Sequence, residues 1–268
     1  MSDDAGARKS ATVAQFNRVA TDFDSEGTFA HYGRRLVELV GVGPGQRVLD
    51  VATGRGAVLF PAAEKVGASG EVAGIDLAEG MVQAANELAA QRGLSVRVRA
   101  MDAEHLGFPD AAFDRVLCGF GIMFFPHLDQ AMGEFRRVLK STGRIGVSTW
   151  RTSPGDHLRT VLDELDLLGS NDWRPPGWIT DPDVLADALT GAGFRNVRVI
   201  ADPLSFVFAD VEQYWQSIRG NLTRRVAEGL DPAQQARARA ALHERFRAFE
   251  QPDGIHVTAT ALLGVGNR

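Results

Sequence analysis

The sequence has a single cysteine, Cys118, among its 268 residues. One thiol cannot form an internal disulfide and cannot build a cysteine-rich zinc site. The composition therefore excludes a small secreted scaffold held by disulfides and favours a reducing compartment, so we expect a cytoplasmic protein. No other residues have the spacing of metal ligands, and we expect no metal.

Positive charge is also in short supply, with 29 Lys and Arg against 34 Asp and Glu, a net charge of −5. This is the wrong sign for a protein that wraps a phosphate backbone, so we expect no nucleic acid partner.

Long apolar runs are absent too. No stretch reaches the roughly 20 residues of a membrane-spanning helix, and residues 1–10 precede no apolar signal segment. We expect no membrane span.

What is present is a 44% hydrophobic composition, enough for a large core. Short apolar runs alternate with helical stretches between residues 43 and 150, which is typical of a doubly wound, Rossmann-like α/β domain with a parallel sheet. The predicted strands are 47–52, 71–76, 95–99, 113–118 and 144–149, and the predicted helices between them end near 65 or span 80–92 and 128–139.

Outside this core the pattern is looser. Residues 1–12 are predicted to be frayed, and helices are predicted from Val13 and over 29–40. We expect an N-terminal helical cap (1–42), a core (43–150), and lid insertions with the last sheet strands (151–268), all within one domain. In the last part we predict helices at 157–168, 182–192 and 211–250 and strands at 197–200 and 255–264, with an aromatic character from Trp150, Trp173, Trp178, Phe206, Phe208 and Trp215.

The sharpest motif is residues 48–56, VLDVATGRG, a strand that ends in a glycine turn before a helix. Gly54 and Gly56 permit left-handed torsions, and free N–H groups at a helix start can hold an anionic group. The third glycine of a dinucleotide fingerprint would fall at Leu59, and no Gly-Lys-Ser/Thr follows, so NAD and Walker loops are excluded. Pro61 predicts a late or kinked helix start.

Three later positions follow strand ends, where open α/β sheets bind ligands. Asp76 is suited to both ribose hydroxyls, and Asp102 to the amino group of adenine. Gly119 and Phe120 would lie near the reacting end of the ligand. Because no phosphate-binding set accompanies them, the pattern predicts an adenosine ligand with a short zwitterionic tail.

The segments 48–56, 74–81 and 102–110, with 113–114 and 120–122, resemble the class I S-adenosylmethionine-dependent methyltransferases, in particular the ubiquinone/menaquinone-biosynthesis C-methyltransferase group. The resemblance is strong over about residues 13–150. It implies a seven-stranded sheet with the last two strands antiparallel, N-terminal helices and a helical substrate lid, and S-adenosylmethionine as cofactor. By position it implies contacts from Asp50, Ala52, Gly54 and Gly56 to the methionine part, from Asp76, Leu77 and Met81 to ribose and adenine, from Asp102 and Ala103 to the adenine edge, and from Gly119 and Phe120 to the sulfonium end.

Methyl transfer from a sulfonium requires that the acceptor be aligned with the methyl group and that water be excluded. A base is needed only where the acceptor must lose a proton. His157 and Glu164 are the candidate catalytic residues, because they lie seven residues apart on one face of a predicted helix. Two solvated positions are the alternative.

We therefore expect a methyltransferase that acts on carbon or oxygen of a small apolar or aromatic metabolite of quinone, polyketide or isoprenoid type. A cyclase or rearrangement enzyme that binds the cofactor without transferring methyl, and a non-catalytic binding protein, remain alternatives, since all three keep the same motifs. A homo-oligomer is possible.

Overall fold

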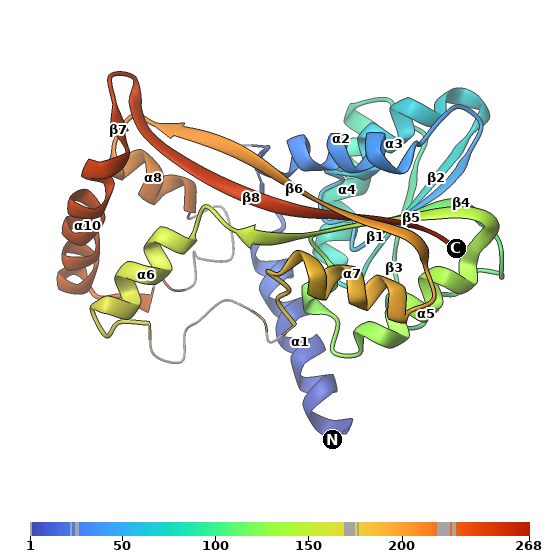
Figure 1. Ribbon diagram of the computed structural model, residues 1–268, viewed down its shortest axis with the longest axis horizontal. Helices are drawn as coiled ribbons and strands as arrows, with labels where there is room; N and C mark the ends of the chain where they lie inside the picture. Colours follow the sequence, from blue (N-terminus) through green and yellow to red (C-terminus); the bar gives the residue numbers. More distant parts are fainter. Residues whose placement is uncertain are drawn as a thin grey trace.

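A computed structural model describes residues 2–21, 23–24, 27–168, 175, 177–218, 226 and 229–268. Its centre is one sheet with the strand order β3-β2-β1-β4-β5-β8-β6, to which a short β7 adds beside β8 (Figure 1). The strands are β1 (Arg47–Val51), β2 (Glu71–Asp76), β3 (Arg97–Ala100), β4 (Phe113–Gly119), β5 (Leu139–Thr152), β6 (Arg195–Phe208), β7 (Glu250–Gln251) and β8 (Gly254–Asn267).

The direction of the strands agrees with the expected architecture. The pairs β1–β2, β1–β4, β2–β3 and β4–β5 are parallel. β8 is antiparallel to both β5 and β6, so the last two long strands run in opposite directions, as predicted. The main path holds the seven expected strands, and the two-residue β7 is an addition that pairs with β8 at its first residues.

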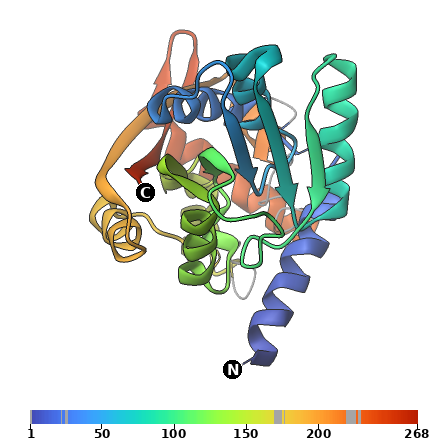
Figure 2. The ribbon, with the colours of Figure 1, turned by 90° about the vertical axis from the view of Figure 1, so that its right-hand side faces the viewer.

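Helices cover both faces of the sheet, because successive residues of its central strands point to opposite sides. In β1, Leu49 packs into the cluster that contains Phe135 and Leu189, whereas Val48 packs with Leu36 and Leu59 on the other side. All six side chains are fully buried, and each such burial contributes about 1.5–3 kcal/mol. The two layers comprise α2 (Thr28–Val40), α3 (Leu59–Val66) and α4 (Glu79–Gln91) on one face and α5 (Leu128–Val138) and α7 (Pro182–Gly191) on the other (Figure 2).

The expectation that residues 1–12 are frayed is wrong, because α1 (Ser2–Val19) begins at Ser2. Its early turns carry little apolar periodicity and are held by tertiary contacts instead. The Lys9 ammonium forms ion pairs with Asp102 and Glu104, and the Gly80 amide donates to Asn17 Oδ1 at 2.8 Å. Polar residues of α1 therefore dock the helix onto the chain after β3 and at the start of α4.

The expectation of a late start for the helix after the glycine turn is confirmed. α3 begins at Leu59 and places Pro61 in its first turn, where the missing N–H group would have no intrahelical partner. Residues 54–58 form the turn that precedes it.

The long strands β5, β6 and β8 have 14 residues each and continue past the central core. Predicted strand lengths were too short here, because the outer pairs form by long-range pairing and carry a weaker apolar pattern. Against this extension pack α6 (Asp156–Glu164), α8 (Val211–Ile218) and α10 (Pro232–Phe246), which we call the accessory helical unit (Figure 1). It has its own core, which includes Leu158, Trp215 and Phe246.

The helical stretch expected over about 211–250 holds α8 and α10 as separate helices. α10 begins at Pro232, after the N-cap residue Asp231, whose side chain forms a capping box with Gln234. α6 ends at Glu164, before the predicted end at residue 168. Residues 169–174, which include Trp173, lie outside the described residues. In the part of the chain that the structure describes, no helix is long and apolar enough to cross a membrane.

Candidate active site

A cavity of about 800 Å³ opens at the carboxyl ends of β1, β2 and β4 and beside the loop after β3. This is the edge at which open α/β sheets bind ligands. The cavity continues from that crevice toward the accessory helical unit, whose α8 contributes Gln216 and Ser217 to its wall. One space thus joins the motif loops to the second half of the chain.

The turn after β1 forms the floor of the cavity. Gly54 and Gly56 have positive φ angles of 53° and 94°, as the turn requires. A side chain at Gly56 would also collide with the ring of Phe60, 2.5 Å from the position of a Cβ atom. Ala52 adopts φ 54° without being a glycine, which is a strained conformation of the kind that gathers at functional sites.

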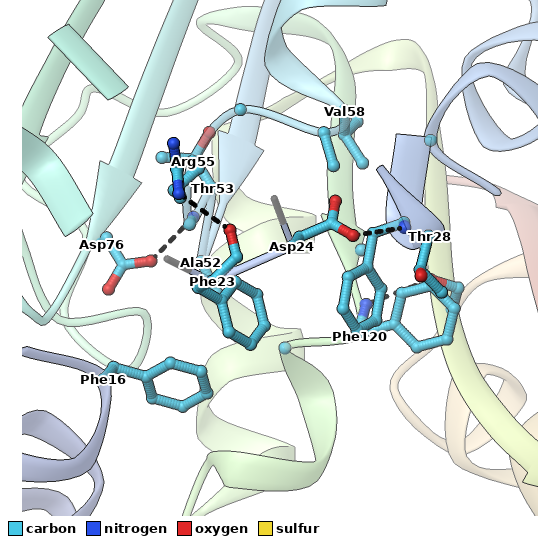
Figure 3. A pocket seen from close by; sticks show the side chains of 18 of the residues that line it. Phe16, Phe23, Asp24, Thr28, Ala52, Thr53, Arg55, Val58, Asp76 and Phe120 are labelled. Carbon is cyan, nitrogen blue, oxygen red and sulfur yellow. Dashed lines mark hydrogen bonds between the residues drawn. The ribbon is translucent and has the colours of Figure 1, made fainter. Parts of the chain in front are cut away.

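Asp76 joins this turn to the start of α4. Its Oδ2 accepts from the Gly54 amide at 2.9 Å, and its Oδ1 accepts from the Ala78 amide at 2.9 Å (Figure 3). Burial raises the pKa of Asp76 although these amides act to lower it. The carboxylate is therefore fixed in place on the cavity wall, with an orientation set by backbone donors.

Asp50 and Met81 do not line the cavity; they lie beneath it. Asp50 is buried, accepts a hydrogen bond from Thr53 Oγ1 at 2.6 Å, and braces the turn from below. Burial, with a smaller effect from the charge of Asp76, raises the pKa of Asp50 to about 7. Met81 is fully buried against Val19 in a small cluster under α1.

The remaining predicted cofactor residues lie on the cavity wall: Ala52, Gly54, Gly56, Asp76, Leu77, Asp102, Ala103, Gly119 and Phe120. Gly119 has room for no side chain, since a Cβ atom there would lie 2.7 Å from Val58. Phe120 has φ 56°, rare for a bulky residue. Its amide donates to the carbonyl of Ser148 at 3.1 Å and to Ser148 Oγ at 3.0 Å, which holds the strained turn.

Beyond Phe120 the cavity becomes a chamber walled by aromatic rings. The Phe120 ring lies 4.4 Å from that of Trp150 and 5.0 Å from that of Phe29. The other aromatic residues of the chamber come from distant parts of the chain: Phe23, Phe124, Trp178, Phe206 and Phe208. The structure thus places most of the predicted aromatic residues at the site, while Trp215 is buried in the accessory helical unit.

Sequence reasoning missed the N-terminal part of this wall. Phe16 and Phe23 recur at helical spacing and read as ordinary core residues, yet both face the cavity (Figure 3). Arg55, inside the glycine turn, was also missed. Its guanidinium donates to the carbonyl of Thr21 and, at 3.1 Å, to that of Phe23, and so ties the turn to this segment. In the sequence, the only feature that could have indicated this role is an arginine in a turn of otherwise small residues.

The structure places His157 and Glu164 away from the described cavity wall. The imidazole of His157 packs against the rings of Phe246 and Phe249, with centroid separations of 5.2 and 5.1 Å. Burial and the adjacent Arg245 guanidinium lower the pKa of His157. Glu164 Oε1 lies 3.5 Å from Arg245, so both residues meet at α10.

Fold and site together define a Rossmann-like protein with a crevice at the carboxyl ends of its strands and an attached chamber walled by aromatic rings. A family model described as a methyltransferase domain matches residues 48–143. Nocamycin O-methyltransferase of Saccharothrix syringae is 35% identical, over 91% of this chain and 93% of its own. The chain therefore belongs to the class I S-adenosylmethionine-dependent methyltransferases, and S-adenosylmethionine is its cofactor.

Two further relatives show how the similarity is distributed. Aklanonic acid methyltransferase DauC of Streptomyces sp. is 34% identical over 73% of this chain and 96% of its own. A ubiquinone/menaquinone biosynthesis C-methyltransferase of Bordetella avium is 36% identical over 50% of this chain and 52% of its own. The similarity to the latter thus covers only about half of each protein.

Solved structures share the fold at lower identity. A putative methyltransferase from Bacillus halodurans superposes with a TM-score of 0.59 at 21% identity, over 87% of this chain and 96% of its own. The [4+2]-cyclase SpnF gives a TM-score of 0.56 at 24% identity, over 89% of this chain and 80% of its own. Both likenesses concern the fold alone.

Proposed function

We propose that this methyltransferase transfers the methyl group to oxygen or carbon of a small, largely apolar acceptor of aromatic or polyketide type. The observation that carries the proposal is the continuity of the cavity from the motif loops past Phe120 into the aromatic chamber. The nocamycin and aklanonic acid enzymes, similar over most of their length, support an acceptor of this class.

On the cofactor side, we propose that Asp76 accepts hydrogen bonds from the ribose hydroxyls and that Asp102 and Ala103 hold the adenine edge. Leu77 would pack on the nucleoside. The turn at 52–56 would cradle the methionine part, and Gly119 and Phe120 would face the sulfonium. The left-handed Gly54 and the fixed Asp76 carboxylate fit this ligand. Asp50 and Met81 act from beneath, by supporting the turn and α1.

When bound, S-adenosylmethionine supplies a methyl group that its sulfonium already activates. The chain has to align the acceptor with that methyl group and to exclude water. Phe120 and Trp150 suit both tasks, because their rings, tilted by 35° and with centroids 4.4 Å apart, form an apolar wall beside the proposed sulfonium end. Aromatic faces also favour a nearby cation.

No histidine lines the cavity within the described residues, which limits the acceptor chemistry. On the acceptor side the described wall offers the carboxylate of Asp24, held by a 3.1 Å hydrogen bond from the Phe29 amide (Figure 3). We therefore propose acceptors whose reacting group is already acidic, such as a phenol, an enol or a carboxylic acid, with Asp24 as the candidate base. His157 and Glu164, which lie off this wall, have no direct role in the proposed reaction.

We propose that the three parts of the chain divide this work. The cap (1–42) and the last part (151–268) would enclose the acceptor, and the core (43–150) would bind the cofactor. The single, buried Cys118 fits a reducing environment, and we place the enzyme in the cytoplasm. A homo-oligomer stays a prediction.

An acceptor panel tests the proposal. The purified protein is incubated with S-adenosylmethionine and hydroxyanthraquinones, their carboxylic acids, cyclic 1,3-diketones or simple aliphatic alcohols. We expect the acidic aromatic and enol compounds to gain one methyl group by mass spectrometry, with formation of S-adenosylhomocysteine. Consumption of a compound at unchanged mass would instead support a cyclase, and cofactor binding without turnover across the panel would support a binding protein.

A further inference from the structure

The first helix forms one wall of the proposed nucleoside site. Lys9, Thr12 and Phe16 of α1 line the cavity together with Met101 and Asp102 from the loop after β3. The ring of Phe16 extends this wall, 5.7 Å from the Phe23 ring and 5.1 Å from the Phe124 ring. A ligand whose adenine edge lay at Asp102 would therefore be covered by α1.

Lys9 holds this wall through two ion pairs. Its Nζ lies 2.6 Å from Asp102 Oδ2 and 2.6 Å from Glu104 Oε2. The Glu104 side chain is 1% exposed, so removal of the ammonium would leave a buried carboxylate without its cation. Breaking a buried pair on one side is strongly unfavourable. Docking of α1 is thus coupled to the charge of Glu104.

Glu104 and Asp102 carry this coupling into the site. Glu104 Oε1 accepts from the His127 amide at 2.8 Å, next to Phe125 and Pro126 of the cavity wall. Asp102 Oδ1 accepts from the Glu104 amide at 2.9 Å. Although partial burial alone would raise it, the hydrogen bond and charge of Lys9 keep the pKa of Asp102 below its ordinary value. Lys9 therefore also fixes Asp102 as an acceptor.

Two more contacts tie the same segment to the other loops of the crevice. Asn17 Oδ1 accepts from the Gly80 amide after β2, and Arg55 after β1 donates to the Phe23 carbonyl. The loops after β1, β2 and β3 are those that carry the proposed cofactor contacts. Consequently, α1 covers the nucleoside only when the helix is docked against these three loops.

We infer that Lys9 is a positioning residue that latches α1 over the adenine end of the cofactor site, so that release of the cofactor product requires its ion pairs with Asp102 and Glu104 to break. The inference rests on the proposed orientation of the nucleoside. It assigns a cofactor-exchange role to the first helix in addition to any contact with the acceptor.

The test is the dissociation rate of S-adenosylhomocysteine, measured by stopped-flow displacement on the full chain. Lys9→Met should release the ligand about tenfold faster or more, whereas Lys9→Arg should stay near the wild-type rate. Arg18→Met is the matched control, because it removes an exposed cation from the same helix and should change nothing. The double variant Lys9→Met/Glu104→Gln should recover part of the slow release, since the buried carboxylate is gone.

Amide hydrogen exchange, measured in the presence of S-adenosylhomocysteine, distinguishes local release of α1 from destabilisation of the whole protein. We expect faster exchange over residues 9–19 in Lys9→Met, with exchange in the central strands unchanged. Wild-type release and wild-type exchange in Lys9→Met would overturn the latch while leaving the proposed function intact. Failure of the wild-type protein to bind S-adenosylhomocysteine would instead overturn the proposed function and, with it, the latch.

Discussion

At the scale of single residues, the strained turn at Ala52 packs closely against Gly121. A Cβ atom at Gly121 would lie 2.6 Å from the Ala52 methyl group and 2.7 Å from Cys118 Sγ. Gly121→Ala should therefore destabilise the protein by about 1–3 kcal/mol. Ala52→Gly in the same chain should recover part of this loss, because it removes one of the two clashes and the left-handed strain. Urea unfolding of the single and double variants measures both effects; equal losses with and without Ala52→Gly would contradict the pairing.

The buried carboxylate of Asp50 makes stability depend on pH. Its pKa is raised to about 7 in the folded state. The folded protein therefore binds the carboxyl proton of Asp50 more tightly than the unfolded chain does. The resulting stabilisation is complete below the unfolded pKa, near 4, and is lost as pH rises through 7. We expect the free energy of unfolding without ligand to fall by about 2–3 kcal/mol between pH 5 and pH 8.

Asp50→Asn provides the check on this assignment. It keeps an oxygen that can accept from Thr53 and removes the ionisation, so the unfolding free energy should vary less between pH 5 and pH 8. Asp76, whose pKa burial also raises, contributes in the same direction and leaves a residual slope. A slope unchanged from that of the wild-type protein would assign the effect to other groups.

At the scale of elements, Tyr214 of α8 connects the accessory helical unit to the acceptor chamber. Its hydroxyl donates to the Pro154 carbonyl at 2.8 Å and accepts from the Leu158 amide at 3.3 Å. The turn 153–155 that it holds lies on the cavity wall. The fully buried side chain thus fixes the position of a wall segment that sequence analysis assigned only to a lid.

Tyr214→Phe should loosen this turn without touching the cofactor crevice. Two backbone groups lose their partner, which costs about 1–3 kcal/mol of stability. We expect the KM for an acceptor found in the panel to rise about threefold to tenfold, while the affinity for S-adenosylhomocysteine stays unchanged. Steady-state kinetics and titration calorimetry give the two values, and an equal loss of both would refute a role confined to the acceptor side.

Element boundaries were predictable where apolar runs end at glycine or aspartate. β2 was predicted at its observed limits, and β1 and β4 within a residue, because these central strands are buried on both faces. The outer part of β6 was missed, since its pairing with β8 joins residues far apart in sequence. The first part of α1, before Val13, was missed for a related reason: it is held by Lys9 through partners about ninety residues away.

At the scale of the whole molecule, the crevice at the strand ends, the proposed cofactor site, was predictable and the aromatic chamber was not. The crevice consists of loops that directly follow strands of one continuous α/β unit, so local motifs place Asp76 and Gly119 correctly on its wall. The chamber is assembled from the first helices, β5, β6 and α8. Single-sequence patterns identify some of its aromatic residues, Phe208 among them, but cannot bring Phe23 and Phe208 to one cavity.

The same distinction explains the placement of His157 and Glu164. Their helical spacing was read correctly, as both lie on α6. The face they share is turned toward Arg245 of α10, because the accessory helical unit forms a core of its own. Spacing fixes which residues share a face, whereas the partner of that face depends on tertiary packing.

The central claim, that this crevice holds the nucleoside cofactor through Asp76 beside an acceptor chamber, is tested most directly by calorimetric titration with S-adenosylhomocysteine. Wild-type protein and Asp76→Ala are compared, after thermal unfolding has shown that the variant is folded, with NAD as the control ligand. We predict micromolar binding to the wild-type protein, binding weakened at least about tenfold in Asp76→Ala, and none of NAD. Equal binding to the two proteins would contradict the assigned site.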